Sequence, residues 1–210
     1  MPVHPNLNKE GMLYQREQYA KGGVSKSYRD YKTNLIFRNI KENHQNILEV
    51  GCGEGLILER LKDRFPERHI AGIDIEPENI SICRKHGLEA IQADVYNLPF
   101  LNESFDCCLC IDVFEHLSSP LEALNQMKEV LCHNGRLIVV IPNDRNFFLA
   151  RMAFGKIKEA FYNAGHVKIW SPSKLKSFLK KEGFSVMENK NIPLAFWSIS
   201  LHHIIVVDKT

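Results

Sequence analysis

The residues with the clearest chemical potential form a glycine-rich turn after a short apolar run. The sequence there is Asn46-Ile-Leu-Glu-Val-Gly51-Cys-Gly53-Glu-Gly55. Glycines are needed where a backbone turns tightly and must approach a ligand without a Cβ in the way. The spacing is Gly-x-Gly-x-Gly, not the Gly-x-Gly-x-x-Gly pattern that seats a pyrophosphate at the start of a helix. Glu49, two positions earlier, suits a ligand with an amino group and a sulfonium and would repel a diphosphate.

Acidic residues follow the next three apolar runs. Asp74 comes about 20 residues after the glycine turn, where an acid can accept both hydrogen bonds of a ribose diol. Asp94 follows the run 91–93, where it can accept a hydrogen bond from an adenine amino group. Asp112 follows Phe105–Ile111 and is expected at the same edge.

Asp112, Glu115 and His116 are spaced i, i+3 and i+4, so a helix starting directly after Ile111 would place all three on one face. Two carboxylates and an imidazole could bind a divalent metal there. The sequence favours proton transfer over a metal, with Asp112, His116 and His166 as the candidate catalytic residues. His166 is equally compatible with a loop histidine that only hydrogen-bonds the loop to the sheet.

The elements that must position these residues alternate in type. We expect strands at Ile47–Val50, Ile70–Ile73, Leu88–Gln92, Phe105–Ile111, Arg136–Ile141, Phe184–Glu188 and Ile199–Val207. Helices are expected at about 55–64, 77–86, 120–131 and 173–182. Ser119-Pro120 marks the start of the third helix, and His133-Asn134-Gly135 marks its end. This alternation predicts an α/β fold in which helices cover both faces of a mainly parallel sheet.

The chain divides into two parts on this interpretation. Residues 1–45 are expected to form a helical N-terminal arm, and residues 46–210 the ligand-binding domain. The stretch 143–170 is too long for a simple loop, and we expect it to be a lid inserted at the carboxyl edge of the sheet.

Composition and net charge limit the classes of partner and the cellular location that we expect. The 210 residues carry a net charge of +2, which gives no electrostatic case for a nucleic-acid partner. No apolar run approaches the ~20 residues of a transmembrane helix, and the first residues lack the apolar core of a signal peptide. The six cysteines form no Cys-x-x-Cys pair, so we expect free cytoplasmic thiols, with those at 107, 108 and 110 packed in the core.

Taken together and in this order, the motifs resemble the class I S-adenosylmethionine-dependent methyltransferases. The resemblance rests on Glu49–Gly55, Gly72-Ile-Asp74, Asp94-x-x-x-Leu-Pro-Phe100, Phe105-Asp106 and Asp112-x-x-Glu-His-Leu117, and it runs from about Asn46 to the C-terminus. It implies a Rossmann-like sheet of seven strands whose last strand is antiparallel. It also implies S-adenosylmethionine as the cofactor and S-adenosylhomocysteine as the product.

The resemblance assigns roles to the strand-end residues. Glu49, Gly51 and Gly53 would hold the methionine part of the cofactor, Asp74 the ribose, and Asp94 with Val95 the adenine. The complete predicted set of cofactor contacts is Glu49, Gly51, Cys52, Gly53, Gly55, Asp74, Ile75, Asp94, Val95 and Ile111. The run Asp112-x-x-Glu115-His116 is similar to one in the ubiquinone-biosynthesis O-methyltransferases, where it is associated with magnesium. In many other members the Glu-His pair carries no metal and shapes the floor of the site.

The predicted function is therefore methyl transfer to a small apolar or aromatic acceptor, most simply on oxygen. Nitrogen or carbon acceptors, and a non-catalytic regulatory subunit with the same fold, stay open. The Phe-rich stretch 145–162 has three interpretations: it lines the acceptor pocket, it touches a membrane surface, or it is a helix that only packs on the sheet edge. The last interpretation suits most of its apolar residues best. A monomer and a homodimer are both compatible with the sequence. A nicotinamide dehydrogenase is disfavoured by the glycine spacing.

Overall fold

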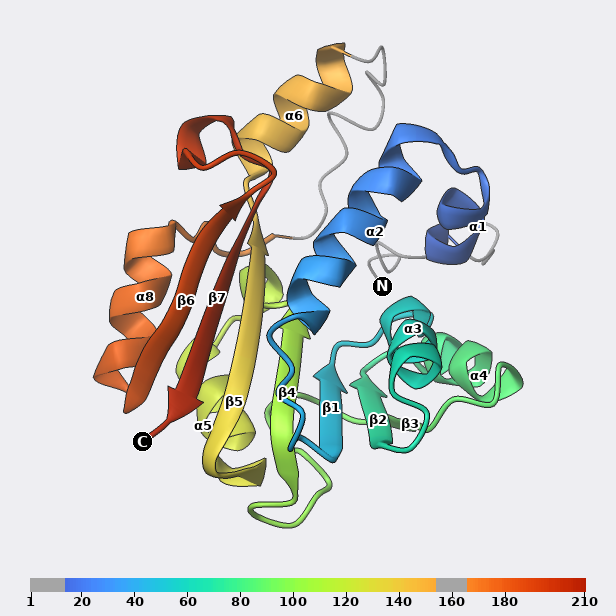
Figure 1. Cartoon of the computed structure of the whole chain (residues 1–210), viewed down its shortest axis with the longest axis vertical. Coiled ribbons are helices and arrows are strands. Elements are labelled where there is room, and N and C mark those ends of the chain that lie inside the picture. The colour runs from blue at the N-terminus through green and yellow to red at the C-terminus, as the bar shows by residue number, and fades with distance from the viewer. Residues whose placement is uncertain (1–13, 154–165) are drawn as a thin grey trace.

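The computed structural model describes residues 14–153 and 166–210, which build a seven-stranded sheet of order β3-β2-β1-β4-β5-β7-β6 (Figure 1). The strands are β1 (Asn46–Val50), β2 (His69–Asp74), β3 (Ala90–Gln92), β4 (Phe105–Ile111), β5 (Leu131–Pro142), β6 (Phe184–Ile192) and β7 (His202–Lys209). Strands β1 to β5 are parallel to one another, whereas β7 runs antiparallel to both β5 and β6. The predicted α/β fold, including its antiparallel last strand, is confirmed.

Helices cover both faces of this sheet. One face packs against α2 (Gly23–Phe37), α3 (Leu56–Arg64) and α4 (Pro77–Lys85), and the other against α5 (Pro120–Val130) and α8 (Pro172–Lys181). The side chains of β4 alternate between the two apolar cores: Cys107 lies in the first, and Cys108 and Cys110 lie in the second. All three are fully buried and free, so the prediction that these cysteines pack in the core is confirmed.

The fifth strand begins earlier than the sequence predicted. It starts at Leu131, directly after α5, and Leu131 pairs with Phe105. The ladder then shifts, and regular pairing resumes where Arg136 meets Cys107. The intervening turn contains Asn134 in a left-handed conformation (φ 59°). The predicted turn residues form an irregularity inside the strand's span, and pairing with β4 is parallel on both sides of it.

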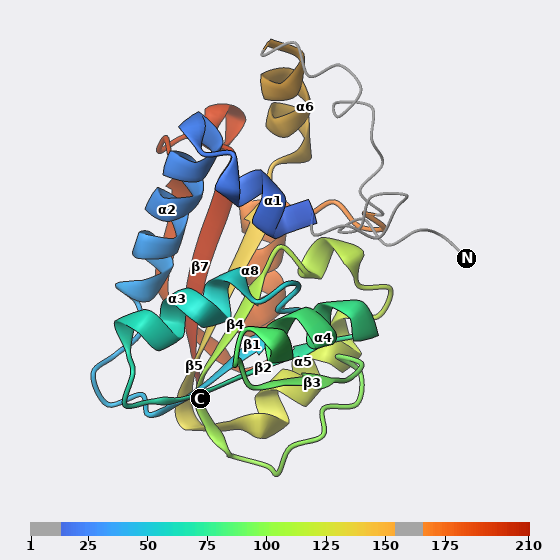
Figure 2. The ribbon, with the colours of Figure 1, turned by 90° about the vertical axis from the view of Figure 1, so that its right-hand side faces the viewer.

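The N-terminal arm forms α1 (Tyr14–Ala20) and α2, separated by Gly22 and Gly23. Figures 1 and 2 both show α1 above α3, at the end of the sheet toward which the parallel strands point. The expected lid 143–170 begins with α6 (Asp144–Ala153), whose Phe148 and Leu149 are exposed. Residues 154–165, and with them part of the stretch 145–162, lie outside the described residues.

Two short 3-10 helices, η1 (Phe114–His116) and η2 (Trp197–Ile199), complete the elements at this end of the sheet. Side chains of Asn143 and Asn146 donate to carbonyl oxygens of the η2 segment, with Asn143 Nδ2 2.6 Å from the Trp197 oxygen. These bonds fasten the start of α6 to the turn that precedes β7. Among the described residues, no helix has the length and apolar character needed to cross a bilayer.

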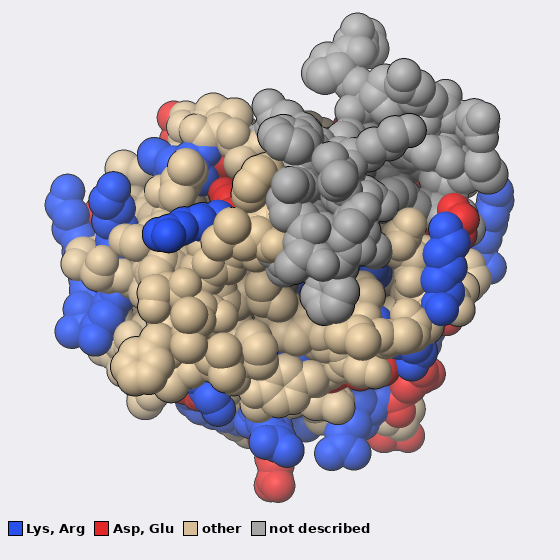
Figure 3. Space-filling model, turned by 90° about the horizontal axis from the view of Figure 1, so that it is seen from above, with Lys and Arg blue, Asp and Glu red and all other residues tan. Residues whose placement is uncertain are grey.

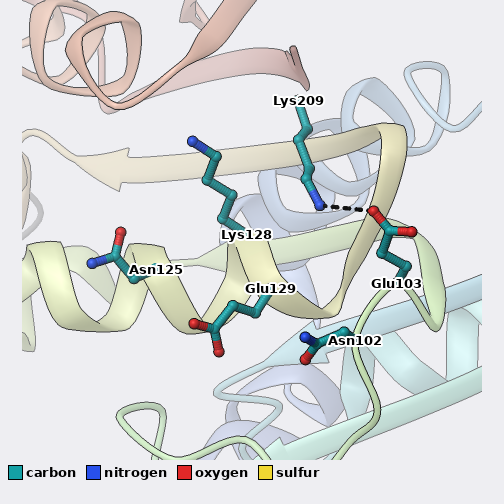
Figure 4. A pocket seen from close by; sticks show the side chains of 6 residues that line it. All are labelled: Asn102, Glu103, Asn125, Lys128, Glu129 and Lys209. Atoms are coloured by element: carbon teal, nitrogen blue, oxygen red, sulfur yellow. Dashed lines mark ion pairs between the residues drawn. The ribbon is translucent and has the colours of Figure 1, made fainter.

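The opposite end of the sheet carries an open hollow. Its lining comes from the loop before β4, from α5 and from the end of β7, and comprises Asn102, Glu103, Asn125, Lys128, Glu129 and Lys209 (Figure 4). The Lys209 ammonium lies 3.5 Å from the Glu103 carboxylate across this hollow. The hollow lies at the amino ends of the parallel strands, whereas ligands of open α/β folds bind at the carboxyl ends. The candidate site is therefore at the other edge.

Candidate functional site

The glycine turn after β1 is held tightly against β2. The backbone amides of Gly51 and Cys52 both donate to the carbonyl oxygen of Ile73, at 2.9 and 2.8 Å. Gly51 has φ 73°, and a Cβ there would lie 2.5 Å from Cγ2 of Val113. Both the conformation and the close approach require glycine at this position. The turn thus exposes backbone at the carboxyl edge of the sheet, as the sequence predicted.

Glu49 lies beneath this turn with an unsatisfied carboxylate oxygen. Its side chain is buried, and its Oε2 has no hydrogen-bond partner among the described residues. Burial raises the pKa of the Glu49 carboxyl well above its usual range, and the nearby Asp74 carboxylate raises it further. A buried acceptor without a donor is costly, so it indicates a missing partner. The ammonium group of the predicted cofactor fits this requirement.

Asp74, at the end of β2, fastens the glycine turn to the start of α4. Its Oδ2 accepts the Gly53 amide at 2.7 Å, and its Oδ1 accepts the Glu76 amide at 2.9 Å and the Asn79 side-chain amide at 3.1 Å. The side chain is buried. Sequence reasoning missed Asn79, which is itself fully buried. The arrangement fixes the carboxylate that the sequence assigns to the ribose, and its oxygens retain lone pairs for further donors.

The remaining predicted cofactor contacts are spread along the same edge. Asp94 is exposed, and its Oδ1 accepts the Tyr96 amide at 3.0 Å, which shapes the turn after β3. Cys52 and Gly55 are buried, Ile75 is 56% exposed, and Val95 and Ile111 are half-buried. All of these residues follow β1, β2, β3 or β4, whose carboxyl ends adjoin in the sheet. The structure therefore brings the predicted set to one edge.

Asp112 does not share a helical face with Glu115 and His116, contrary to the sequence-based expectation. It adopts a left-handed conformation with φ 55°, and only a single 3-10 turn, η1, follows it. Its Oδ2 lies 2.6 Å from the Lys32 ammonium. Burial raises the pKa of the Asp112 carboxyl, but Lys32 and His202 outweigh this effect and hold the pKa below its usual range. Asp112 is thus suited to remain ionised, which makes it a poor general base.

A polar network that the sequence did not reveal surrounds Asp112. The Lys32 ammonium also lies 3.3 Å from Nε2 of His202, whose Nδ1 lies 2.7 Å from the Tyr28 hydroxyl. Burial lowers the pKa of His202, and Lys32 lowers it further, which favours a neutral ring. The network joins α2 to the start of β7 and the end of β4. The His202-His203 pair, which begins the last strand, was the sequence signal for it.

A second cluster contains the other predicted catalytic residues. Nδ1 of His166 lies 2.8 Å from Oδ1 of Asp144, and its Nε2 lies 4.0 Å from Oε1 of Glu115. The rings of His116 and His166 meet edge to face, with centroids 4.8 Å apart. Sequence reasoning missed Asp144, the first residue of α6. The carboxylate fixes the orientation of the His166 ring and leaves Nε2 toward the cluster.

Glu115 anchors this cluster from η1. Its backbone oxygen accepts the amides of Val167 and Lys168, so the segment after His166 is tied to η1. Its side chain is buried, and Oε2 has no hydrogen-bond partner among the described residues. Burial raises the pKa of the Glu115 carboxyl well above its usual range, and Asp112 adds to this effect. Another buried carboxylate oxygen is therefore available to a ligand.

The same cluster contains ligand types that a divalent metal accepts. One ligand atom each from Glu115, His116 and His166 lies within 4.8 Å of the others. Asp112, the third member of the metal set considered from the sequence, is not in this group because Lys32 holds it elsewhere. The contact of His166 Nδ1 with the Asp144 carboxylate would suit a His166 that acts either as a metal ligand or as a general base.

Comparisons with known proteins find methyltransferases similar to this chain. The family profile described as "Methyltransferase domain" matches residues 48–139. A ubiquinone biosynthesis O-methyltransferase of Xylella fastidiosa is 31% identical over 120 residues, which are 53% of this chain and 48% of that protein. The chain thus spans about half the length of these curated relatives. A demethylmenaquinone methyltransferase of Thermotoga maritima is 26% identical over 78% of this chain and 79% of its own length.

Solved structures show the same fold. A methyltransferase structure from Thermotoga maritima, described as a possible histamine N-methyltransferase, aligns with a TM-score of 0.69 and 21% identity, over 93% of this chain and 96% of the other. The profile match covers the glycine turn, Asp74, Asp94 and Asp112, which are the residues that the geometry brings to one edge. Sequence and profile converge on a methyltransferase domain over residues 48–139, in a chain with the fold of the solved methyltransferase structures.

Proposed function

We propose that the protein transfers a methyl group from S-adenosylmethionine to an oxygen atom of a small apolar or aromatic acceptor. The observation that carries this proposal is the ion-pair geometry of His166 with Asp144, 2.8 Å apart, beside the Glu115 carboxylate, whose Oε2 has no hydrogen-bond partner among the described residues. An oxygen acceptor must lose its hydroxyl proton, and an imidazole oriented by a carboxylate is suited to take it.

The cofactor, when bound, supplies an electrophilic methyl group on a sulfonium. Glu49 would receive the ammonium group at its unpartnered oxygen, and the turn at Gly51 and Gly53 would let the ligand approach the backbone. Asp74 would accept the ribose hydroxyls, and Asp94 with Val95 would contact the adenine. The roles of these residues are part of the proposal, and their support is the shared edge and the buried, unsatisfied oxygen of Glu49.

On the acceptor side, we assign the general base to Nε2 of His166. Asp144 holds the proton on Nδ1, so the lone pair at Nε2 is free to take the hydroxyl proton as the new carbon–oxygen bond forms and the carbon–sulfur bond breaks. His116 would contact the acceptor beside His166. Asp112, kept ionised by Lys32, would orient ligands instead of exchanging protons. Much of the rate would come from alignment of donor and acceptor with water excluded.

The surface around this edge favours an uncharged acceptor. Seen from above, the described part of this face is mostly uncharged, and the Lys and Arg side chains gather at its rim (Figure 3). The exposed Phe148 and Leu149 of α6 add apolar area next to Asp144. Both observations fit a small apolar or aromatic molecule, because pockets for such ligands are lined mainly by apolar side chains with few polar groups.

The test is methyl transfer from labelled S-adenosylmethionine to catechol by the wild type and two variants. We expect His166→Ala to lower kcat by roughly 10²- to 10⁴-fold, the usual contribution of a general base. Calorimetry with S-adenosylhomocysteine should give the same Kd as the wild type within about twofold. His133→Ala, which changes an exposed histidine in the turn at the other end of the sheet, is the matched control.

Two results would overturn the proposal. Full activity of His166→Ala on catechol would exclude His166 as the general base. Absence of S-adenosylhomocysteine binding by the wild type would remove the cofactor assignment altogether.

A further inference from the structure

The N-terminal arm is attached directly to the cofactor turn. The carboxylate of Glu54, inside the turn, is fully buried. Its Oε1 accepts the backbone amide of Gln15 at 3.0 Å, and its Oε2 accepts that of Arg16 at 2.7 Å. Hydrogen bonds to a charged carboxylate are about twice as strong as neutral ones. The Glu54 side chain thereby binds two backbone amides that lie 39 and 38 positions earlier in the chain.

Arg16 strengthens this attachment from the other side. Its Nε donates to the carbonyl oxygen of Glu54 at 3.0 Å, and its Nη1 lies 2.9 Å from the Glu59 carboxylate on α3. Asp30 on α2 accepts the Tyr19 hydroxyl at 2.7 Å and lies 3.0 Å from Arg60, also on α3. Both helices of the arm therefore contact the helix that the glycine turn begins.

This attachment brings the Gln15 side chain onto Gly53. A Cβ at Gly53 would lie 2.9 Å from Oε1 and 3.2 Å from Nε2 of Gln15. The amide group therefore packs against the Cα of Gly53, the glycine whose amide is held by Asp74. A glycine at this position serves the arm as well as the cofactor. The sequence pattern assigned no role to Glu54 or to Gln15.

We propose that Glu54 is a positioning residue for cofactor binding, which fixes the arm so that Gln15 closes the S-adenosyl site over Gly53. The proposal rests on the proposed function, because it requires an S-adenosyl ligand at the turn. The arm then forms one wall of the site, and the ligand leaves when the bonds between Glu54 and the two arm amides open. The consequence is kinetic: loss of the attachment speeds dissociation more than it slows association.

The experiment measures Kd and the dissociation rate of S-adenosylhomocysteine for the full chain and four variants. Glu54→Ala removes both acceptors, and we expect Kd and dissociation rate to rise roughly ten- to hundredfold. Glu54→Gln keeps one acceptor oxygen and should lie between Glu54→Ala and the wild type. Gln15→Ala keeps the hydrogen bonds of Glu54 to the arm amides but removes the side chain that lies on Gly53. It should raise the dissociation rate by roughly three- to tenfold. Glu17→Ala, on the exposed side of α1, is the matched control and should resemble the wild type.

Turnover supplies the readout that a merely structural role would not move. In Glu54→Ala and Gln15→Ala, KM for S-adenosylmethionine should rise while kcat with catechol stays within about twofold. If Glu54→Ala fails to fold, Gln15→Ala against Glu17→Ala decides the question, because neither removes a buried charge.

If Gln15→Ala leaves the dissociation rate unchanged while the wild type binds the ligand normally, Gln15 does not close the site. The proposed function would be unaffected by that result. A wild type that does not bind S-adenosylhomocysteine would overturn the cofactor assignment and this proposal with it.

Discussion

The turn after β1 and the segment after β4, which contains Asp112 and η1, are neighbours at one edge of the sheet. Their polar side chains differ in how fully they are hydrogen-bonded. In the first, Asp74 holds the turn with one oxygen and the start of α4 with the other, and Glu54 uses both oxygens to hold the arm. In the second, Asp112 has a left-handed backbone, Glu115 keeps a buried oxygen without a partner, and two imidazoles meet edge to face. Glu49 is the exception in the first region, with one unpartnered oxygen.

This difference indicates a division of labour. A cofactor shared by many relatives is best bound by a rigid turn whose hydrogen bonds are already made, because little ordering then opposes binding. The second region keeps unsatisfied and strained groups, which native structures tolerate mainly at functional sites. The four predictions below test whether the two regions separate in this way, from the largest expected effect to the smallest.

Asp74→Ala should damage the cofactor region most. It removes the acceptor for the amides of Gly53, Glu76 and Asn79, so the turn loses its fixed shape. We expect Kd for S-adenosylhomocysteine to rise roughly 100-fold or more, because several charge-assisted hydrogen bonds are lost together. Asp94→Ala, which changes an exposed carboxylate, should have a much smaller effect by the same calorimetry. Near-normal binding by Asp74→Ala would contradict the role of the turn.

Asp144→Asn should damage only the acceptor region. The carboxylate that orients His166 becomes an amide, and we expect kcat with catechol to fall roughly 10- to 100-fold while cofactor affinity stays unchanged. Asp144→Glu retains the charge and should recover part of the loss in the same assay. A parallel loss of S-adenosylhomocysteine affinity would show that the two regions are not separate.

Glu49→Gln should weaken cofactor binding and stabilise the free protein. Because the pKa of Glu49 is raised in the folded state, its stabilising contribution is complete below the ordinary glutamate pKa and is lost as pH rises through the raised value. The neutral amide avoids this loss. We expect Tm at pH 8 to exceed that of the wild type by roughly 2–4 °C, with a smaller gain at pH 5.

The same variant should bind S-adenosylhomocysteine roughly tenfold more weakly, because its amide lacks the charge that pairs with an ammonium group. Glu67→Gln, at an exposed position, is the control and should change neither quantity. Equal affinity of Glu49→Gln and the wild type would exclude the proposed contact.

Chelation should have the smallest effect. We expect EDTA treatment to change catechol methylation by less than about twofold, because His166 is assigned to proton transfer. Activity that disappears and returns with Mg²⁺ or Mn²⁺ would instead assign Glu115, His116 and His166 to a metal.

Local patterns in the sequence were sufficient to predict the fold. Alternating short apolar runs and amphipathic stretches predicted the strands, the helices and the mainly parallel sheet, because burial on a sheet face or a helix stripe imposes a period on neighbouring residues. Glycine spacing and acids after successive strands predicted one edge for Glu49, Asp74 and Asp94, since parallel strands end on the same side. The start of β5 was missed because the same turn residues suit a helix end and a bulge.

Only the tertiary structure decided which side chains meet. Lys32 reaches Asp112 across 80 positions and His202 across 170, and Glu54 holds an arm 39 positions earlier. Asp112 lies apart from Glu115 and His116 because its left-handed backbone and its pairing with Lys32 prevent the helix that their spacing suggested. Such contacts depend on strand order, on register and on where the arm packs, and none of these leaves a repeat in the sequence. The sequence thus determined the edge at which the glycine turn lies, whereas packing determined that the arm contacts it and which buried carboxylate oxygens have no partner among the described residues.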